Sequence, residues 1–575
     1  MRKLLKYLEN YKKECMLAPL LKMLEAVFEL IVPLVISYMI DSGIRQGAVS
    51  VIARSFVILL ALALTGLIVS CTAQYFAAKA ATGFSKELRR DLFSHIMSFG
   101  FSEIDNTGTS TLITRATSDV NILQNGVNIF LRLFLRSPFI VAGACIMAFY
   151  IDPKTAMIFI LVVLCLSVAV TVIMKVNIPL LLAVQKKLDD VLCLVRENLS
   201  GARVVRAFTL EEEQIKTFGE VNGELNRTQI ISGRISGLLN PLTYVLVNLA
   251  IVLLIYTGNI RYSQGILTTG MIVALYNYMS QILLELIKFA NLIVTMNRTF
   301  ASAERVNSVF DVHAGMAFSN SPVQVFLKEG SPAVEFKNVS LKYHELSDEA
   351  VSDISFCVPA GSSFGIIGPT GSGKTTIASL IPRFYDATSG CVLIGGVDVK
   401  DTDISSLRKR VGIVMQRAVL FEGTIRDNLR WGNEDATDEE LLEAAKAAVC
   451  LDVIETKGGL DAKVEPQGRN FSGGQRQRLS IARVLAARPE ILILDDSSSA
   501  LDHLTDKKLR ENIAALSYKP TVIIISQRSV SVKDCDSILV LDDGNCAGLG
   551  THRKLLDTCE IYREIDSADP VKEAV

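Results

Sequence analysis

The chain has 575 residues, of which 50% are hydrophobic, and its mean hydropathy is +0.36. That composition excludes a wholly soluble protein and predicts a membrane-embedded portion. The net charge is −1, so no overall field attracts nucleic acid, and the 11 cysteines contain no Cys-x-x-Cys pair or Cys/His cluster that would indicate a disulfide framework or a zinc site.

Six apolar segments in the first half of the chain are long enough to cross a hydrocarbon core of about 30 Å. They lie at 15–40, 55–78, 128–150, 155–178, 240–258 and 268–295. In the first half of the chain, most Lys and Arg residues outside these segments lie in the N-terminal segment and in the long connections 79–127 and 179–239, which places all three in the cytoplasm. We therefore expect an all-α transmembrane domain over residues 1–315, with six membrane helices and long cytoplasmic loops.

Two acidic residues fall inside the first apolar segment, where a charge is costly unless it lines a cavity or is paired. Glu25 and Glu29 are four residues apart and therefore share one helix face. One interpretation is an acidic patch in the translocation path that would suit cationic cargo. The other is an internal ion pair that fixes helix packing, with Lys22, Arg132 or Arg136 as the cation. The sequence does not decide between them.

Residues 316–332 lose the apolar periodicity of the first half and contain Ser-Pro pairs, which predicts a linker. The remainder, 333–575, carries short β-rich runs, a glycine loop followed by a helix, and two later apolar runs. These runs lie at 333–339, 352–358, 363–367, 491–495 and 521–526. The pattern is typical of an α/β domain with a parallel-sheet core and an antiparallel β subdomain in front of it.

The most informative motif is a glycine loop that matches GxxxxGK[ST] and joins a strand to the helix that begins at Thr376. Its residues are Gly368, Pro369, Thr370, Gly371, Ser372, Gly373, Lys374 and Thr375. In such a loop, backbone N–H groups surround phosphate oxygens, Lys374 reaches the β and γ phosphates, and Thr375 ligates magnesium. Asp495, at the end of a later buried run, is placed to hold the metal through water. A chance glycine turn is the alternative, but the strand-loop-helix context favours a phosphate loop, with Thr376 among its contacts.

A second motif points to a family. Phe471 is followed by Ser472, Gly473, Gly474 and Gln475, which resembles the LSGGQ signature of ATP-binding cassette (ABC) domains. The second domain therefore resembles an ABC nucleotide-binding domain of the P-loop type. The first domain, which ends in Ala-Ser-Ala-Glu-Arg at 301–305, resembles the transmembrane domain of an ABC exporter. With the membrane domain first, the chain is similar to a half-transporter.

The resemblance implies ATP and Mg²⁺ as ligands, and it implies roles for further residues. Tyr343 would stack on adenine, although on its own it would more simply be a packing residue. Gln416 would contact magnesium and couple the domains, and Asp502 would bond across a cassette dimer. In this family two cassettes pair head to tail, so that the signature of one chain completes the ATP site of the other. The segments 118–119 and 201–208 would lie around the coupling helices, although their polarity also suits an ordinary solvated stalk.

Two departures from the family pattern fall at the γ-phosphate. Directly after the metal-binding aspartate, the family has a glutamate that activates water, and this chain has Asp496. The missing methylene retracts the carboxylate by roughly 1.5 Å. The family's switch histidine is replaced by Gln527, whose amide does not take up a proton. We expect ATP binding with poor turnover. The alternative is that both substitutions are harmless. A third change, Pro466, removes an acidic residue upstream of the signature.

The function implied by the resemblance is ATP-driven export of small amphipathic or lipid-like molecules across the plasma membrane of a bacterial cell. The intact signature beside a weakened ATP site resembles the degenerate-site subunit of a heterodimeric exporter. The expected partners are a second half-transporter chain with an intact catalytic site, membrane lipid and a small-molecule substrate, and no nucleic acid. Two alternatives remain: a homodimeric exporter with two slow sites, and an ATP-gated regulatory membrane subunit that does not pump.

Overall fold

The computed structural model describes residues 2–312, 316, 323–324, 331–343 and 348–568. It divides into two compact units. The first unit comprises Met1–Met97 and Thr109–Val312, and the second comprises Ser98–Gly108 and His313–Val575. The linker expected over 316–332 lies for the most part outside the described residues. We describe each unit by itself.

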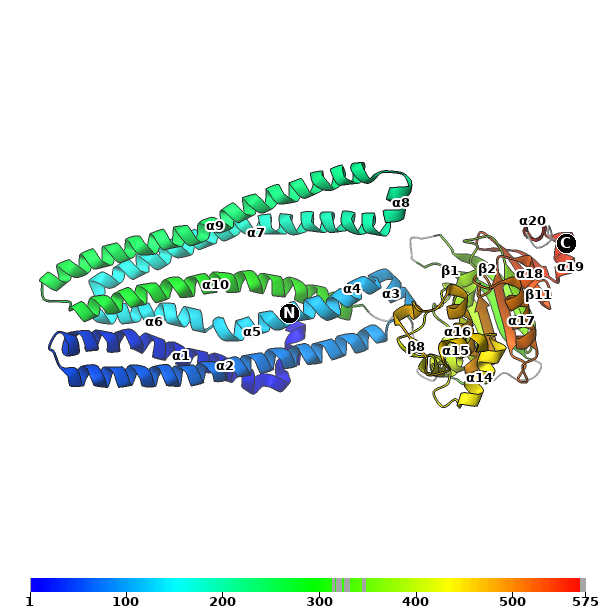
Figure 1. Cartoon of the computed structure of the whole chain (residues 1–575), viewed down its shortest axis with the longest axis horizontal. Coiled ribbons are helices and arrows are strands. Elements are labelled where there is room, and N and C mark those ends of the chain that lie inside the picture. Colours follow the sequence, from blue (N-terminus) through cyan, green and yellow to red (C-terminus); the bar gives the residue numbers. More distant parts are fainter. Residues whose placement is uncertain (1, 313–315, 317–322, 325–330, 344–347, 569–575) are drawn as a thin grey trace. The chain divides into compact units, whose positions relative to one another are not determined.

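The first unit is entirely helical among its described residues (Figure 1). Its elements are η1 (Arg2–Tyr11), α1 (Lys12–Tyr38), η2 (Met39–Ile44), α2 (Val49–Met97), α4 (Thr109–Thr114), η3 (Arg115–Asp119), α5 (Val120–Leu133), α6 (Arg136–Ile151), α7 (Pro153–Ser200), α8 (Ala202–Ala207), α9 (Glu211–Ser263) and α10 (Thr269–Phe310). Among the residues that the structure describes, six helical segments are long and apolar enough to cross a membrane, which confirms the six predicted spans. Helices α2, α7 and α9 have 49, 48 and 53 residues, far more than the ~20 that a bilayer requires, so each continues beyond it.

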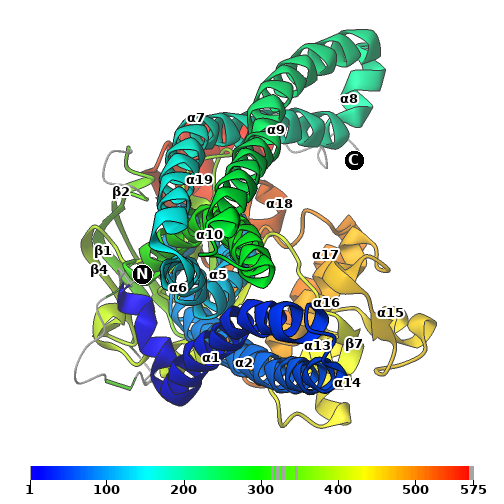
Figure 2. The ribbon, with the colours of Figure 1, turned by 90° about the vertical axis from the view of Figure 1, so that its left-hand side faces the viewer.

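The helices of this unit pack in pairs, α1 with α2 and α7 with α9. Figure 2 shows the α7/α9 pair extending away from α1 and α2 toward α8. Glycines permit two close helix crossings: a Cβ added at Gly126 would lie 2.1 Å from the Thr299 hydroxyl, and one at Gly143 would lie 2.4 Å from a Leu30 methyl carbon. Close backbone approach of this kind is how helices associate in lipid, where apolar burial between them supplies little driving force.

Six charged side chains meet inside the helical unit. They are Lys22, Glu25 and Glu29 of α1, Arg136 of α6, and Glu285 and Lys288 of α10. Arg136 donates to Glu29 at 2.7 Å and to Glu285 at 2.8 Å. Lys22 donates to Glu25 at 2.6 Å. Three cations balance three acids, so the arrangement favours the internal ion-pair interpretation over an acidic patch for cationic cargo. Arg136 and Lys22 are the cations, whereas Arg132 makes no ion pair among the described residues.

The described part of the second unit contains three sheets. The central sheet has the order β12-β11-β3-β10-β9-β6 and is parallel except for β12. Its strands are β3 (Ser363–Ile367), β6 (Val411–Val414), β9 (Ile491–Asp495), β10 (Thr521–Ser526), β11 (Ser537–Asp542) and β12 (Asn545–Gly550). An antiparallel sheet, β2-β1-β4-β5, consists of β1 (Pro332–Leu341), β2 (Val351–Pro359), β4 (Ser389–Ile394) and β5 (Val397–Asp398). A small third sheet pairs β7 (Gly423–Thr424) with β8 (Lys463–Val464). The predicted α/β class, with an antiparallel β subdomain, is confirmed.

Helices cover both faces of the central sheet. The helices of this unit are α3 (Phe101–Thr107), α11 (Lys374–Leu380), η4 (Val399–Asp401), α12 (Ile404–Arg410), α13 (Ile425–Arg430), α14 (Asp438–Ala447), α15 (Leu451–Lys457), η5 (Pro466–Gly468), α16 (Gly473–Ala486), α17 (His503–Ala514), α18 (Ser529–Val532), α19 (His552–Thr558) and α20 (Glu560–Ser567). Side chains alternate along β9 and β10: Ile493 and Ile523 join the core that includes α11, whereas Leu494 joins the core that includes α16 and α17. Burial on both faces explains why β9 is a continuous apolar run, whereas β10 is fully buried on one face and partly buried at Val522 and Ile524 on the other.

Candidate nucleotide-binding site

Strand register brings the functional residues of the second unit to one edge of the central sheet. In β10, Ile525 pairs with Asp495 of β9 and Ser526 pairs with Ile367 of β3. The three segments that follow these strands therefore begin side by side at their carboxyl ends, which is where ligands bind in parallel α/β sheets. They carry the glycine loop, Asp496 and Gln527.

The loop after β3 has the geometry of a phosphate cradle. Gly371 and Gly373 adopt left-handed conformations, with φ of 87° and 92°. A Cβ at Gly373 would lie 2.6 Å from a Val351 methyl carbon, whereas one at Gly371 would meet nothing within 4 Å and faces open space. The Lys374 ammonium donates to the Gly368 carbonyl at 2.8 Å and to the Pro369 carbonyl at 2.6 Å, so the lysine is held inside the loop. Burial lowers the pKa of Lys374.

A pair of oxygen ligands adjoins this cradle. The Thr375 hydroxyl donates to Asp495 Oδ1 at 3.3 Å. Burial raises the pKa of Asp495 to about 6, an effect that the Thr375 hydrogen bond partly offsets. A hydroxyl, a carboxylate and the nearby Gln416 amide are hard oxygen donors of the kind that Mg²⁺ prefers. The residues present therefore fit a nucleotide with its magnesium ion.

The two substituted positions make their own contacts. Asp496 has a left-handed φ of 45°, and its Oδ2 accepts a hydrogen bond from Gln416 Nε2 at 3.3 Å. Strained backbone at a non-glycine residue costs free energy and is concentrated at functional sites. The Gln527 Oε1 accepts from the Thr370 hydroxyl at 3.3 Å, so the amide is tied to the phosphate loop.

A cavity of about 290 Å³ gathers most of the predicted residues. Its predicted lining residues are Tyr343, Thr370, Gly371, Gly373, Lys374, Thr375, Thr376, Gln416, Asp495, Asp496 and Gln527. Ala350 and Ile525 also line it and were missed, because neither carries a chemical signal in the sequence. The signature residues Ser472–Gln475 and Asp502 do not line this cavity. That separation is what a site completed by a second chain requires.

The signature lies at the start of α16. The Ser472 hydroxyl accepts from the Gln475 backbone N–H at 3.3 Å, and the Gln475 side chain accepts from the Ser472 N–H at 3.0 Å, which forms a capping box. A Cβ at Gly473 would meet nothing within 4 Å, so the backbone there is open to an approaching group. Asp502 caps α17 by accepting from the Thr505 N–H at 3.1 Å.

A chain of aromatic contacts links the cavity to α3. The Tyr343 hydroxyl is 3.0 Å from the Thr376 hydroxyl, and the Tyr343 ring meets the Tyr385 ring edge-on at 5.0 Å. Tyr385 in turn donates to Asp105 of α3 at 2.6 Å. Phe101 of α3 stacks on Phe384 at 4.4 Å. The segment Ser98–Gly108 thus belongs to the cassette unit, although the sequence analysis included it in the transmembrane domain over residues 1–315.

Replacing Tyr385 by Phe is expected to uncouple cargo from hydrolysis while leaving ATP binding within about twofold, because it removes only the hydrogen bond to α3. The measurement is cargo-stimulated ATPase activity against basal activity in lipid nanodiscs. Asp105→Asn keeps an acceptor for the tyrosine and should retain most of the stimulation. Tyr343→Phe is the matched control on the nucleotide side and should change ATP affinity instead. Equal stimulation in Tyr385→Phe and the unmodified protein would contradict the role of this contact.

Magnesium-dependent nucleotide binding is expected to weaken as the pH falls through the Asp495 pKa of about 6. A carboxyl group with a raised pKa is ionised above that value and neutral below it, and the neutral form is a poor metal ligand. Between about pH 7 and about pH 5 the apparent Mg²⁺ affinity should fall about tenfold. Titrating Mg²⁺ against a fluorescent ATP analogue at both pH values tests this. Asp495→Asn should remove the pH dependence, and an unchanged Mg²⁺ affinity at low pH would contradict the assignment.

The cradle, its internal lysine and the paired hydroxyl and carboxylate define a P-loop nucleotide-binding site. Comparison with known proteins agrees with this class. Residues 15–286 match the ABC transporter transmembrane region, and residues 351–499 match the ABC transporter domain. The chain is 32% identical to an uncharacterised ABC transporter ATP-binding protein of Mycobacterium bovis, over 99% of this chain and 98% of that protein.

Two further similarities cover nearly the whole chain. A putative multidrug export ATP-binding/permease protein of Bacillus subtilis is 30% identical, over 98% of each chain. The solved structure of a bacterial Atm1-family ABC exporter with ATP bound aligns with a TM-score of 0.81 and 26% identity, over 98% of each chain. The protein therefore belongs to the ABC transporter family, as a half-transporter with its membrane domain fused to its ATPase domain.

Proposed function

We propose that this chain is the degenerate-site subunit of a heterodimeric exporter that moves small amphipathic or lipid-like molecules across the bacterial plasma membrane. Its partner is a second half-transporter chain with an intact catalytic site. The N-terminus and the cassette lie in the cytoplasm. The observation that carries the proposal is the pair of substituted side chains at one cavity, Asp496 and Gln527, each already engaged by a neighbour.

In this site the chain's residues hold ATP better than they cleave it. Lys374 and the loop N–H groups bind the phosphates, and Thr375, Gln416 and Asp495 hold Mg²⁺, which neutralises phosphate charge when bound. Asp496 keeps a carboxylate for water, but its shorter side chain places that group back from the position a glutamate would reach. Positional errors near 1 Å cost on the order of a hundredfold in rate. Gln527 still donates and accepts hydrogen bonds, but it does not carry the positive charge of a protonated histidine.

The signature segment, which does not line this cavity, is suited to turnover in the partner. Gly473 presents open backbone at the start of a 14-residue helix, and Ser472 is fixed at its N-cap. An anion at a helix N-terminus is stabilised by unpaired N–H groups and the helix dipole. The chain thus completes an ATP site on its partner while its own site acts as a slowly opening clamp. A ligand shifts the equilibrium between the open and closed arrangements of the cassettes only by binding one arrangement more tightly than the other.

The cargo class rests on the membrane unit and on one relative. The six charged side chains around Arg136 balance, so they supply no net charge that would select a strongly ionic cargo. The similar Bacillus subtilis protein is described as a putative multidrug exporter. An amphipathic small molecule entering from the inner leaflet suits both observations.

The test compares this chain purified alone with the chain co-purified with the half-transporter encoded beside it. We expect slow ATP hydrolysis by the single chain and rapid, cargo-stimulated hydrolysis and transport by the pair. A homodimeric exporter would transport cargo without the second chain. A regulatory subunit would bind ATP but give no transport in either preparation. Either result would contradict the proposal.

A further inference from the structure

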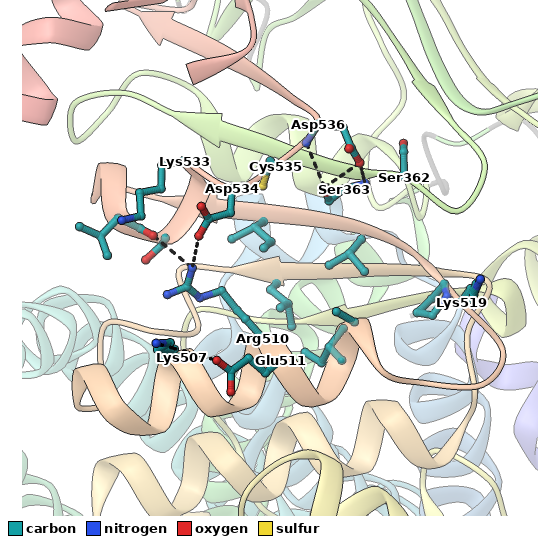
Figure 3. Close-up of a pocket in the computed structure, with 18 of the residues that line it drawn as sticks. Ser362, Ser363, Lys507, Arg510, Glu511, Lys519, Lys533, Asp534, Cys535 and Asp536 are labelled. Atoms are coloured by element: carbon teal, nitrogen blue, oxygen red, sulfur yellow. Dashed lines mark hydrogen bonds and ion pairs between the residues drawn. The ribbon is translucent and has the colours of Figure 1, made fainter. Parts of the chain in front are cut away.

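A second cavity in the cassette unit is larger than the nucleotide cavity, at about 750 Å³. It lies between α17, β10 and the segment 530–536 (Figure 3). Its floor is the sheet face opposite the phosphate loop, formed by Leu494 of β9 with Val522 and Ile524 of β10. A volume of this size suits a drug-sized molecule. Its lining shares no residue with the nucleotide cavity and includes none of the signature residues.

The topology explains why this face is open. The connection from β10 to β11 must pass over β3, because the strand order there is β11-β3-β10. The only helix in that connection, α18, has four residues and covers little of the sheet. Val522 and Ile524 are consequently only partly buried, although they belong to the apolar core. Ala514 adds a small side chain to the α17 wall, and Leu504, 81% exposed, lies at the rim.

One buried polar atom has no partner in this wall. Arg510 donates through Nη1 to the Val530 carbonyl at 3.1 Å and lies 3.2 Å from Asp506 through Nη2. Its Nε is buried and has no hydrogen-bond partner among the described residues. Leaving a buried charged donor unpaired is costly, so a ligand acceptor that meets Nε when the Arg510 side chain shifts toward the cavity would be favourable.

Four cations and three carboxylates line the cavity, an excess of one positive charge: Lys507, Arg510, Lys519 and Lys533 against Glu511, Asp534 and Asp536. The lining carboxylates already have neighbours: Glu511 lies 4.0 Å from Lys507, Asp534 lies 3.9 Å from Arg510, and Asp536 accepts from the Ser363 N–H at 2.8 Å. Lys519 and Lys533 make no ion pair among the described residues. The cavity thus combines an apolar floor with a cationic rim, which is complementary to an amphipathic anion.

We propose that this cavity is an allosteric site for a small organic anion with an apolar body, whose carboxylate or sulfonate accepts a hydrogen bond from Arg510. The elements that form its walls continue into segments that carry residues of the nucleotide cavity and Asp502. Asp502 is the N-cap of helix α17, β9 ends at Asp495, and β10 ends one residue before Gln527. A molecule seated between α17 and β10 therefore favours one arrangement of these segments over another, and so changes the rate of hydrolysis. The binding itself does not depend on which of the two ATP sites turns over.

The test uses 4-phenylbutyrate as the probe and 4-phenylbutan-1-ol as its uncharged analogue. Calorimetric titrations are run on the full-length transporter in lipid nanodiscs, with empty nanodiscs as the blank. We expect saturable binding of the anion, about tenfold tighter than that of the alcohol, because a hydrogen bond to a charged group is stronger than one to a neutral group. Equal affinities, or heats no larger than those of empty nanodiscs, would overturn the site.

Three variants decide where the probe binds. Ala514→Phe fills the cavity, and Arg510→Lys keeps the charge but removes Nε, so each should weaken binding by about tenfold. Lys508→Gln changes an exposed α17 residue outside the cavity and should leave binding unchanged. Saturating probe should also shift the ATPase rate of the unmodified transporter about twofold or more, and not that of Ala514→Phe. An unchanged rate, or loss of subunit pairing in Ala514→Phe, which would make the cavity a subunit interface, overturns the proposal.

Discussion

The combined replacement of Asp496 by Glu and Gln527 by His is expected to raise the ATPase rate of the purified chain by about a hundredfold. The glutamate returns the carboxylate by the length of one methylene, and the histidine supplies a group able to carry positive charge at the γ-phosphate. The intact signature of a second copy completes the site in this preparation. The measurement is steady-state phosphate release in nanodiscs.

Two kinds of control show where the gained activity arises: the two single replacements, and loss of the Lys374 side chain in the double variant. Each single replacement should recover less than the pair, because residues that act together at one site are strongly non-additive. Adding Lys374→Ala to the double variant should abolish the gained activity, which shows that it arises at this phosphate loop. If the double variant were as slow as the unmodified chain, while still binding ATP, the two substitutions would not be the cause of slow hydrolysis.

The second large effect is expected from Gly473→Glu in the paired transporter, with ATPase activity falling about a hundredfold. A side chain at this position meets nothing within 4 Å in its own chain, and an acidic residue in the first turn of α16 is compatible with the helix. The new carboxylate would instead face the γ-phosphate bound to the partner. Like-charge repulsion there opposes cassette closure.

The control for this variant separates folding from catalysis. Thermal unfolding and nucleotide binding at this chain's own cavity should remain close to those of the unmodified protein, because Gly473 does not line that cavity. Ser472→Ala removes only the capping hydroxyl and should cost less activity. Retention of full ATPase activity by Gly473→Glu would mean that this signature does not complete the productive site.

Most of the fold could be predicted from local patterns in the sequence. Long apolar runs predict membrane helices because the bilayer sets their length, and the glycine loop is recognisable because all its parts are contiguous. Contacts between distant segments were harder to predict. The docking of α3 depends on Phe101 meeting Phe384 and on Asp105 meeting Tyr385, and nothing in the sequence around residue 101 indicates those partners.

The same limit applies inside the membrane unit and the site. The sequence left Lys22, Arg132 and Arg136 as possible cations for Glu25 and Glu29. Only the packing of α1, α6 and α10 selects Lys22 for Glu25 and Arg136 for Glu29. Ala350 lines the nucleotide cavity through its position beside the phosphate loop, without any functional group to mark it. Asp496 was marked by its place after Asp495, the aspartate expected to hold the metal, but its left-handed backbone and its hydrogen bond to Gln416 required the structure.

The most direct test of the central claim follows the fate of bound nucleotide in the paired transporter. The complex is loaded with α-labelled ATP, free nucleotide is removed, and the bound ATP and ADP are quantified over time. We predict that one nucleotide is converted to ADP rapidly, whereas the other stays as ATP and is lost in the Lys374→Ala variant of this chain. Conversion of all bound nucleotide at a single rapid rate would contradict a site built to hold ATP rather than cleave it.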